Sequence, residues 1–474
     1  MLRQAAMNRY PTPSAGSRQA LATRTKTWRR WGTLCLLPVL LALPAAARTR
    51  PHYGGTLRVE IEGEPWQRPG GLARRLVFDG LTTMSLDGTP QPALAIEWKS
   101  EDNDHRWQFR LRPGVHFHDG TPMTSVNVVA SLTTLCTAGC PWTGVHAIGA
   151  SVVFTCDSPM PNLPSLLAGD DYRIALTIAE NGATPAGNIG TGPFQLTGFT
   201  NGVLTLAAND NCWQGRPFLD GIEIRVHRAI RDQWLDLSVG RADLVEVPAE
   251  QLRQAKEQRL TIMASPPVTL LALQVADSGV LGNPNLRAAI VQAIDRGALS
   301  NVIFQKQGEV TASLLPAAIT GYSFLFPTAR DLNKAHELRG GLTPPPFILT
   351  VDGDGAMQLA AQRIALNLHE AGFVVQIVPI AQHADLVLRQ LSLEGSQPAA
   401  ALASLLVAAG QTTPVEAQSL DEFFKLEREV LSYNTLIPLL YLPRAFAVSG
   451  RIRDLRLAAD GAPDLAGVSL EDAP

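Results

Sequence analysis

The chain has 474 residues, about three times the size of a single domain, so we expect two or more lobes with their own cores. Hydrophobic residues make up 46% and charged residues 18%, a balance typical of a globular protein. The formal net charge is −3 and becomes −10 without the basic residues 1–47, which argues against a nucleic-acid partner.

Residues 1–47 have the three parts of a signal peptide. A stretch with seven basic residues and no acidic one precedes an apolar run at 31–43 and three alanines that end at Ala47. We expect cleavage near Ala47 and a periplasmic location. An uncleaved membrane anchor is the alternative, but Pro38 and Pro44 interrupt a core shorter than the ~20 residues of a spanning helix. A pair of adjacent arginines leaves twin-arginine export open.

Four cysteines follow this segment, an even number in a compartment that permits disulfides. Three pairings can be drawn. Cys136 and Cys140 are close enough in sequence for a local bridge, which would leave Cys156 and Cys212 to pair. A four-thiolate zinc site is the alternative, but the chain has one short cysteine spacing and it is not the usual two-residue gap.

The first half of the chain after residue 47 reads mainly as strands. Alternating apolar residues predict a half-buried strand over 54–61, and residues 72–81 read as a short helix. Residues 106–122 read as a strand, a turn and a strand, with Trp107, Phe109 and Leu111 on one face. A helix capped by Thr124 or Ser125 follows, and then a hairpin over 144–156. A second β region starts at Gly190 and leads to a helix over 232–239.

The second half has an α/β character. A strand is predicted over 268–275, and residues 283–304 read as one helix with a stripe of Leu286, Ile290, Ile294 and Leu299. Residues 347–351, a helix with Leu359, Ile364 and Leu368, and residues 374–380 form a predicted βαβ unit. The apolar run 436–448 suits a strand that returns to the first lobe, so that two crossing strands form a hinge.

Several separated segments occur in the order typical of one family. They include GGTLRV from Gly54, the block from Leu76 to Leu132, GTGPFQLTGF from Gly190, NPNLRAAIVQAIDR from Asn283, and IPLLYLPRAFAVSGRIRDLRL from Ile437. Together these segments span about 54–456, and in them the chain resembles the family 5 extracellular solute-binding proteins of ABC importers, the dipeptide, oligopeptide and nickel type.

The resemblance implies an α/β, bilobed periplasmic-binding-protein fold of type II, in the large peptide-binding class. The first lobe would comprise residues 48–268 plus 445–474 and the second residues 269–444. The ligand would be enclosed between the lobes by hinge closure and passed to an ABC permease. We expect a monomer, no cofactor, and a small peptide-like or other polar solute as ligand.

Three departures from the family pattern concern the ligand. The segment between the first strand and Leu76 is short, and the first crossing strand ends in Gln274 where the family often has Asn. The loop in which peptide-binding members offer a carboxylate is replaced by residues 389–413, with Asp385 and Glu394 as the acids nearest to it. A binding module or sensor that does not serve transport is therefore the alternative function.

Other motifs favour structural readings. His116 and His118 form an H-x-H pair, but a turn role is favoured over metal binding because no third ligand is suggested nearby. Asp352 and Asp354 lack the spacing and closing Glu of a calcium loop. The chain shows no nucleophile elbow, zinc-protease or phosphate-loop motif, so we expect that it is not an enzyme, with a hydrolase as the remaining alternative.

Four residues are the candidates for ligand contact. Gln274, Tyr441 and Arg444 lie on or at the ends of the predicted crossing strands, and Trp142 would act as a lid. Three of them also have a structural interpretation: core packing for Tyr441, a surface ion pair for Arg444, and cover of the cysteine loop for Trp142.

Overall fold

The computed structural model of the protein describes residues 51–66, 71–85, 89–135, 140–176, 189–322, 325–351, 353, 355–379, 383–393, 398–411, 415, 417 and 419–471. The predicted signal peptide lies outside these residues. None of the helices within the described ranges is long and apolar enough to cross a membrane.

One 11-stranded sheet forms the centre of the fold. Its strands run, in spatial order, β15 (Val375–Ile377), β14 (Phe347–Val351), β16 (Leu386–Ser392), β12 (Thr261–Val275), β17 (Leu436–Val448), β11 (Leu244–Glu246), β1 (Thr56–Glu60), β10 (Gly221–Arg225), β9 (Val203–Ala208) and β8 (Phe194–Thr200), with β13 (Glu309–Val310) paired to β17. Strands β14, β15 and β16 belong to the second lobe. Strands β1, β8, β9, β10 and β11 belong to the first lobe.

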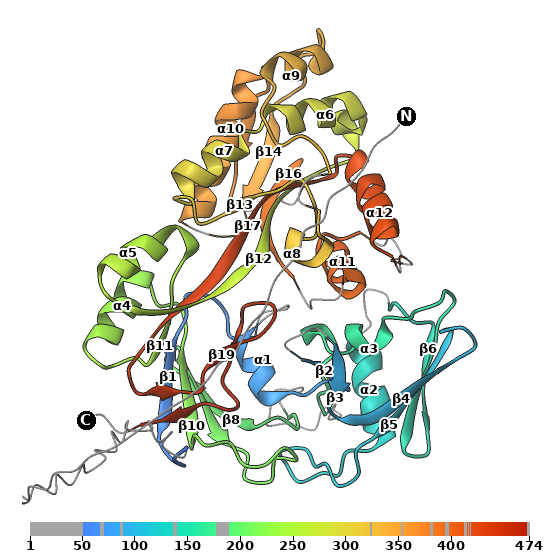
Figure 1. Cartoon of the computed structure of the whole chain (residues 1–474), viewed down its shortest axis with the longest axis vertical. Helices are drawn as coiled ribbons and strands as arrows, with labels where there is room; N and C mark the ends of the chain where they lie inside the picture. Colours follow the sequence, from blue (N-terminus) through green and yellow to red (C-terminus); the bar gives the residue numbers. More distant parts are fainter. Residues whose placement is uncertain are drawn as a thin grey trace, which may run out of the picture. The chain divides into compact units, whose positions relative to one another are not determined.

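The two longest strands connect these lobes, as Figure 1 shows. β12 and β17 pair antiparallel from Thr261 opposite Val448 to Gln274 opposite Leu436. β12 begins seven residues before the predicted Val268. The pairing is irregular around Pro267, because a proline has no N–H group to donate to the neighbouring strand. The predicted pair of crossing strands is confirmed, and its irregular pairing makes it suited to bend.

The predicted βαβ unit of the second lobe is confirmed. β14 lies parallel to both β15 and β16, and α10 (Ala356–Glu370) provides the crossover. Of the three apolar residues named in the predicted helix, Ile364 and Leu368 lie on the buried face of α10, whereas Leu359 is 53% exposed. The alanines at 360 and 361 occupy the buried positions instead.

The long helix predicted over 283–304 is broken into α6 (Pro284–Ala293), α7 (Arg296–Ala298) and a π-helical turn, η4 (Leu299–Ile303). The four residues of its predicted stripe are nevertheless all buried. The break falls at Asp295, whose carboxylate accepts a hydrogen bond from the N–H of Ala298 at 2.8 Å. A side chain that caps a new helix favours an interruption over a continuous helix.

The first lobe carries a second sheet with the order β4 (Ala95–Glu101), β5 (Arg106–Leu111), β7 (Ser151–Thr155) and β6 (Gly144–Ile148). The predicted alternation is confirmed, since Trp107, Phe109 and Leu111 are all buried. The predicted cap of α2 (Ser125–Leu135) is also confirmed, because the N–H of Asn127 donates to the Thr124 hydroxyl at 3.3 Å.

The remaining elements are short. The helices are α1 (Leu72–Val77), α3 (Leu163–Leu166), α4 (Ile230–Ser238), α5 (Leu252–Glu257), α8 (Ala317–Thr320), α9 (Leu332–Arg339), α11 (Pro398–Ala408) and α12 (Leu420–Ser432), with 3-10 turns η1 (Asp170–Tyr172), η2 (Ala249–Gln251) and η3 (Gly279–Gly282). The strands are β2 (Thr82–Met84), β3 (Pro90–Pro92), β18 (Ile452–Arg453), β19 (Arg456–Leu457), β20 (Pro463–Asp464) and β21 (Ser469–Leu470). Within the segment 389–413, which replaces the loop expected from the resemblance, residues 398–408 form the helix α11.

Candidate functional site

A cavity of about 400 Å³ is the candidate site, a volume within the ~300–1,000 Å³ of small-molecule sites. The first lobe lines it with α1, residues 83–85 and the stretch from α3 to Arg173. The hairpin of β19 and β20 and the residues up to Ala466 form another wall. Among the lining residues that the structure describes, Ser404 of α11 comes from the second lobe.

An ion network joins three of these segments. Arg75 of α1 lies 2.7 Å from the carboxylate of Asp170 and also pairs with Asp460 at the tip of the hairpin. Arg173 contacts Asp170 at 2.7 Å, and its guanidinium also donates to the carbonyl of Phe78 at 2.7 Å. Each carboxylate of the network therefore has a cation, and the hairpin is tied to α1.

The network holds Arg75 and Asp170 in their charged forms. Burial by itself would lower the pKa of Arg75, but the carboxylates of Asp170 and Asp460 outweigh it and raise that pKa above its ordinary value. Burial would likewise raise the pKa of Asp170, yet Arg75 and Arg173 hold it well below its usual range. These groups satisfy one another and are not free to bind a ligand.

Asp79 follows α1, and its carboxylate also has hydrogen-bond partners within the protein. Its Oδ2 accepts hydrogen bonds from the hydroxyl of Thr191 at 2.9 Å and from the indole N–H of Trp213 at 2.8 Å. The backbone comes very close here, since a Cβ built on Gly192 would lie 2.6 Å from the carbonyl oxygen of Leu76. Only glycine fits at that position, which explains the GTGP motif at 190–193.

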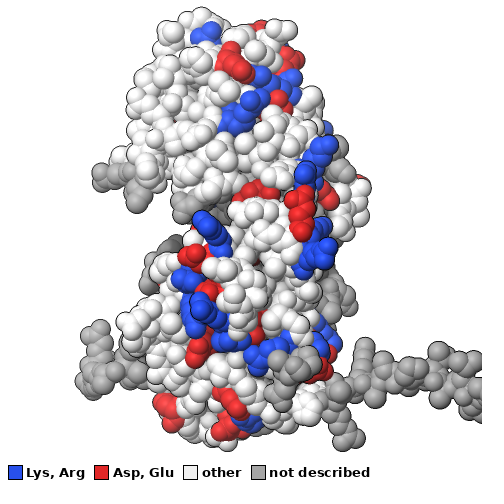
Figure 2. Space-filling model, turned by 90° about the vertical axis from the view of Figure 1, so that its left-hand side faces the viewer, with Lys and Arg blue, Asp and Glu red and all other residues white. Residues whose placement is uncertain are grey.

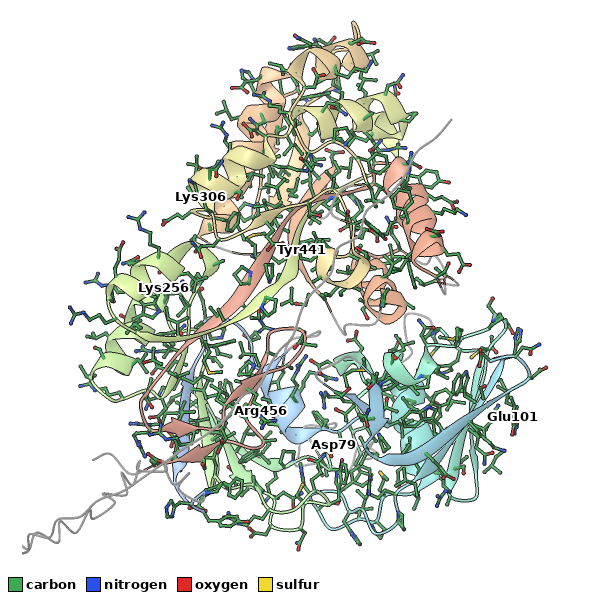
Figure 3. All side chains as sticks on the ribbon, in the orientation of Figure 1. Asp79, Glu101, Lys256, Lys306, Tyr441 and Arg456 are labelled. Atoms are coloured by element: carbon green, nitrogen blue, oxygen red, sulfur yellow. The ribbon has the colours of Figure 1, made fainter. Side chains whose placement is uncertain are left out.

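The polar lining residues without partners form a second set. Among the side chains that the structure describes, those of Ser165, Gln214, Ser404 and Arg456 make no hydrogen bond or ion pair with the protein. Asp464 uses one carboxylate oxygen to accept from the N–H of Ala466 at 3.2 Å. The cavity thus has a fixed ionic framework and a small set of polar groups available to a ligand. Figure 3 labels Arg456 and Asp79.

The predicted contacts Gln274 and Tyr441 lie on the crossing strands but bond within the second lobe. The Gln274 amide donates to the carbonyl of Ala409, and its oxygen accepts from Arg389 at 3.3 Å. Tyr441 is buried, and its hydroxyl donates to the carbonyl of Leu314. Neither side chain lines the 400 Å³ cavity.

Trp142 and Arg444 differ in their surroundings. Trp142 is buried, with its ring 5.0 Å from that of Phe154. Arg444 is half-buried on β17, and within the described part of the chain its guanidinium has no ion pair. Burial lowers the pKa of Arg444, while Asp460 and Glu246 act in the opposite direction. The ligand roles of these two residues, and of Gln274 and Tyr441, remain predictions.

The predicted pairing of Cys156 with Cys212 is wrong, because both are free thiols. Cys156 packs in the apolar cluster around Phe109 and Phe154, whereas Cys212 lies in the turn after β9. Burial raises the pKa of Cys156 to about 11, so this thiol is unreactive at neutral pH. Cys136 lies outside the described residues, and its bridge to Cys140 stays a prediction.

The histidine pair has a structural place in the fold. Nδ1 of His118 accepts from the N–H of Gly190 at 3.3 Å, and its Nε2 lies 3.0 Å from the carbonyl oxygen of Gly192. His116 contacts the carbonyl of Gly114 at 3.0 Å. Over the ranges described above, no group of three or more His, Cys, Asp or Glu side chains could hold a metal ion.

Sequence reasoning missed Arg75, Arg456 and the acidic hairpin tip. The hairpin lies only a few residues beyond the predicted crossing strand, and the polar run RIRDLRLAAD after Gly450 was an available signal. Its ion-pair partner is Arg75, which is 385 residues away from Asp460 in the sequence. Such a contact depends on tertiary structure and leaves no local pattern.

One family model matches more than half of the chain. The model for bacterial extracellular solute-binding proteins, family 5 Middle, matches residues 89–406. YhjP of Bacillus subtilis, an uncharacterised protein, is 36% identical over 33% of this chain and 28% of its own length. The probable D,D-dipeptide-binding periplasmic protein DdpA of Escherichia coli is 26% identical over 61% of this chain and 60% of its own. The chain thus matches less than two thirds of either relative.

A solved structure extends the likeness to the fold. The ABC transporter-associated periplasmic binding protein DppA of Helicobacter pylori, in complex with the peptide STSA, superposes with a TM-score of 0.76 at 18% identity. The match covers 89% of this chain and 99% of that one. At this identity it shows the fold alone, and the predicted bilobed α/β architecture is confirmed.

Proposed function

Because the chain belongs to the bacterial extracellular solute-binding proteins of family 5, we propose that it captures a small peptide-like or other polar solute outside the cytoplasm and delivers it to an ABC permease. The observation that carries this proposal is the cavity, whose lining includes groups of the first lobe, the C-terminal hairpin and Ser404 of the second lobe. The peptide ligands named for DdpA and for the Helicobacter pylori protein support the solute class.

The proposal includes the organisation of the exported protein. Residues 1–47 would be removed near Ala47, the first lobe would comprise 48–268 plus 445–474, and the second lobe 269–444. The crossing strands β12 and β17 support these boundaries. On the face in Figure 2, basic and acidic side chains alternate over short distances, a mixed surface that suits a protein in free solution.

Capture requires that the ligand bind the closed arrangement of the lobes better than the open one. A ligand shifts such an equilibrium only by its difference in affinity for the two states. Groups from both lobes would contact the ligand together only in the closed arrangement. The irregular pairing at Pro267 supports bending of the crossing strands at that point.

A side chain that fills the cavity tests this function. We expect Ser404→Phe to abolish ligand-induced stabilisation, whereas Val407→Phe, on the same helix but 61% exposed and outside the cavity, preserves it. The measurement is the thermal unfolding midpoint of the purified protein with amino acids, peptides, opines, sugars and metal chelates. A ligand at a hundred times its Kd adds about 2.7 kcal/mol to the free energy of unfolding. Equal stabilisation of both variants would contradict the proposed site.

A further inference from the structure

Two opposite charges face each other on the C-terminal hairpin. Arg456 of β19 is directly opposite Asp464 of β20 in the antiparallel register, and both residues line the cavity. Residues opposite each other in such a pair have Cβ atoms about 4.5–5.5 Å apart and point to the same face. The two side chains are therefore neighbours on one wall of the cavity.

Both side chains are exposed to solvent and form no ion pair with each other, although an equivalent exposed pair in the protein does. Glu97 and Arg110 are directly opposite in β4 and β5, and their side chains form an ion pair at 2.6 Å. No ion pair joins Arg456 to Asp464 or to any other residue that the structure describes. One carboxylate oxygen of Asp464 is held by the N–H of Ala466, which restrains the side chain toward its own turn.

We propose that Arg456 and Asp464 together receive the head of an α-amino acid, with the ligand carboxylate on Arg456 and its ammonium group on Asp464. This inference rests on the proposed function and names its ligand class. A guanidinium binds a carboxylate through two parallel hydrogen bonds, and a carboxylate accepts from an ammonium group. In an α-amino acid a single carbon separates the two charges, which suits two neighbouring side chains.

The spacing distinguishes this head group from a peptide with two free termini. Every added residue moves the carboxylate away from the ammonium group by up to ~3.3–3.6 Å in an extended chain. The charged ends of a peptide therefore cannot both reach neighbouring positions on one hairpin unless the peptide folds back on itself. The ligand would carry both charges on one carbon and direct its side chain into the rest of the cavity.

The other walls suit this orientation. The hairpin that carries the pair is anchored, because Asp460 at its tip pairs with Arg75 of α1. The remaining polar lining groups without partners, among them Ser165 and Ser404, are uncharged. Leu166 adds apolar surface next to them. A neutral side chain is thus the part of the ligand that these walls would accept.

The test uses the full purified protein with the twenty L-amino acids, scored by the thermal midpoint and then by calorimetric titration of the amino acid that stabilises most. The same amino acid is tested as its N-acetyl derivative, as its amide and as its dipeptide with alanine. We expect each blocked derivative and the dipeptide to bind at least tenfold more weakly than the free amino acid. Equal affinity for the blocked derivatives would overturn the inference.

Two substitutions that remove a charge test which group of the ligand each side chain binds. Arg456→Gln should remove the preference for the free acid over the amide, and Asp464→Asn should remove the preference for the free amine over the N-acetyl form. Asn keeps the oxygen that accepts from Ala466, so the turn is retained. The matched controls Arg110→Gln and Glu97→Gln neutralise the equivalent pair outside the cavity, and they should leave every affinity unchanged.

The failure of this inference is distinguishable from that of the proposed function. If no amino acid stabilises the protein but a sugar or a peptide does, and Ser404→Phe abolishes that effect, the amino-acid head is wrong while solute capture stands. Unchanged amino-acid affinity in both Arg456→Gln and Asp464→Asn would also overturn the inference, because a solvated surface pair would behave in that way.

Discussion

Asp170 is a buried carboxylate with two ion-pair partners in the candidate site. Its carboxylate contacts Arg75 and Arg173 in a buried setting, and loss of one partner of a buried ion pair leaves an uncompensated charge. We expect Asp170→Asn to lower the free energy of unfolding by ~3 kcal/mol. Urea denaturation measures this, with Glu97→Gln as the exposed control that leaves the urea midpoint unchanged. Equal effects of the two substitutions would contradict the role of the network.

The same carboxylate makes stability depend on pH. Its pKa in the folded protein lies well below the ~3.9 of an unfolded aspartate, so the folded state binds fewer protons at acidic pH. The contribution of Asp170 is therefore fully present above about pH 4 and is lost as pH falls further. The difference in stability between the native protein and Asp170→Asn should shrink from pH 7 to pH 3. A constant difference over that range would show that ionisation of Asp170 does not stabilise the fold.

At the residue scale, sequence reasoning located the crossing strands but not the groups that line the cavity. Gln274 and Tyr441 were singled out by position along a strand, and the structure gives both side chains partners within the second lobe. Arg456 and Asp464 become neighbours only through the hairpin. A strand pattern predicts which residues share a face, but it does not predict which face borders a cavity.

At the scale of elements, the cap of one helix illustrates what local sequence determines. The hydroxyl of Ser419 accepts from the N–H of Glu422 at 3.3 Å in a capping box at the start of α12. We expect Ser419→Ala to lower the free energy of unfolding by ~1 kcal/mol. Ser432→Ala, at the other end of the same helix, is the control for loss of a hydroxyl and should change stability less. Denaturant titration measures the loss of stability in each variant, and equal losses would contradict the role of the cap.

A glycine in the first lobe tests the close approach of two segments. A Cβ at Gly192 would lie 2.6–2.7 Å from backbone atoms of Leu76 and Val77, which cannot move aside as a flexible side chain does. We expect Gly192→Ala to destabilise the protein by ~2 kcal/mol or more. Gly198→Ala has open space around the added methyl group and is the matched control. Similar denaturation midpoints for both variants would contradict the predicted clash.

Periodicity predicted most elements because burial and secondary structure share the same repeat. The βαβ unit and the hairpin over 144–156 are confirmed on that ground. The continuous helix over 283–304 failed because the apolar stripe continues across the break at Asp295, where a side-chain cap starts a new helix. An apolar stripe reports which residues are buried and does not by itself report helix continuity.

At the scale of the whole molecule, the fold was predictable because several motifs in a fixed order identify the family. The ligand was not, because it depends on a cavity assembled from segments up to 391 positions apart, from Arg75 to Ala466. The segment 389–413, which departs from the family pattern, supplies Ser404 to that cavity through α11. This departure therefore places a small hydroxyl side chain in the second-lobe wall.

The central claim is that a polar solute bound in this cavity brings the two lobes together. Small-angle X-ray scattering of the purified protein, with and without the solute that raises its thermal midpoint most, tests it directly. The account predicts that the solute lowers the radius of gyration of the native protein and leaves that of Ser404→Phe unchanged. A solute that binds and stabilises the native protein without changing its radius of gyration would contradict it.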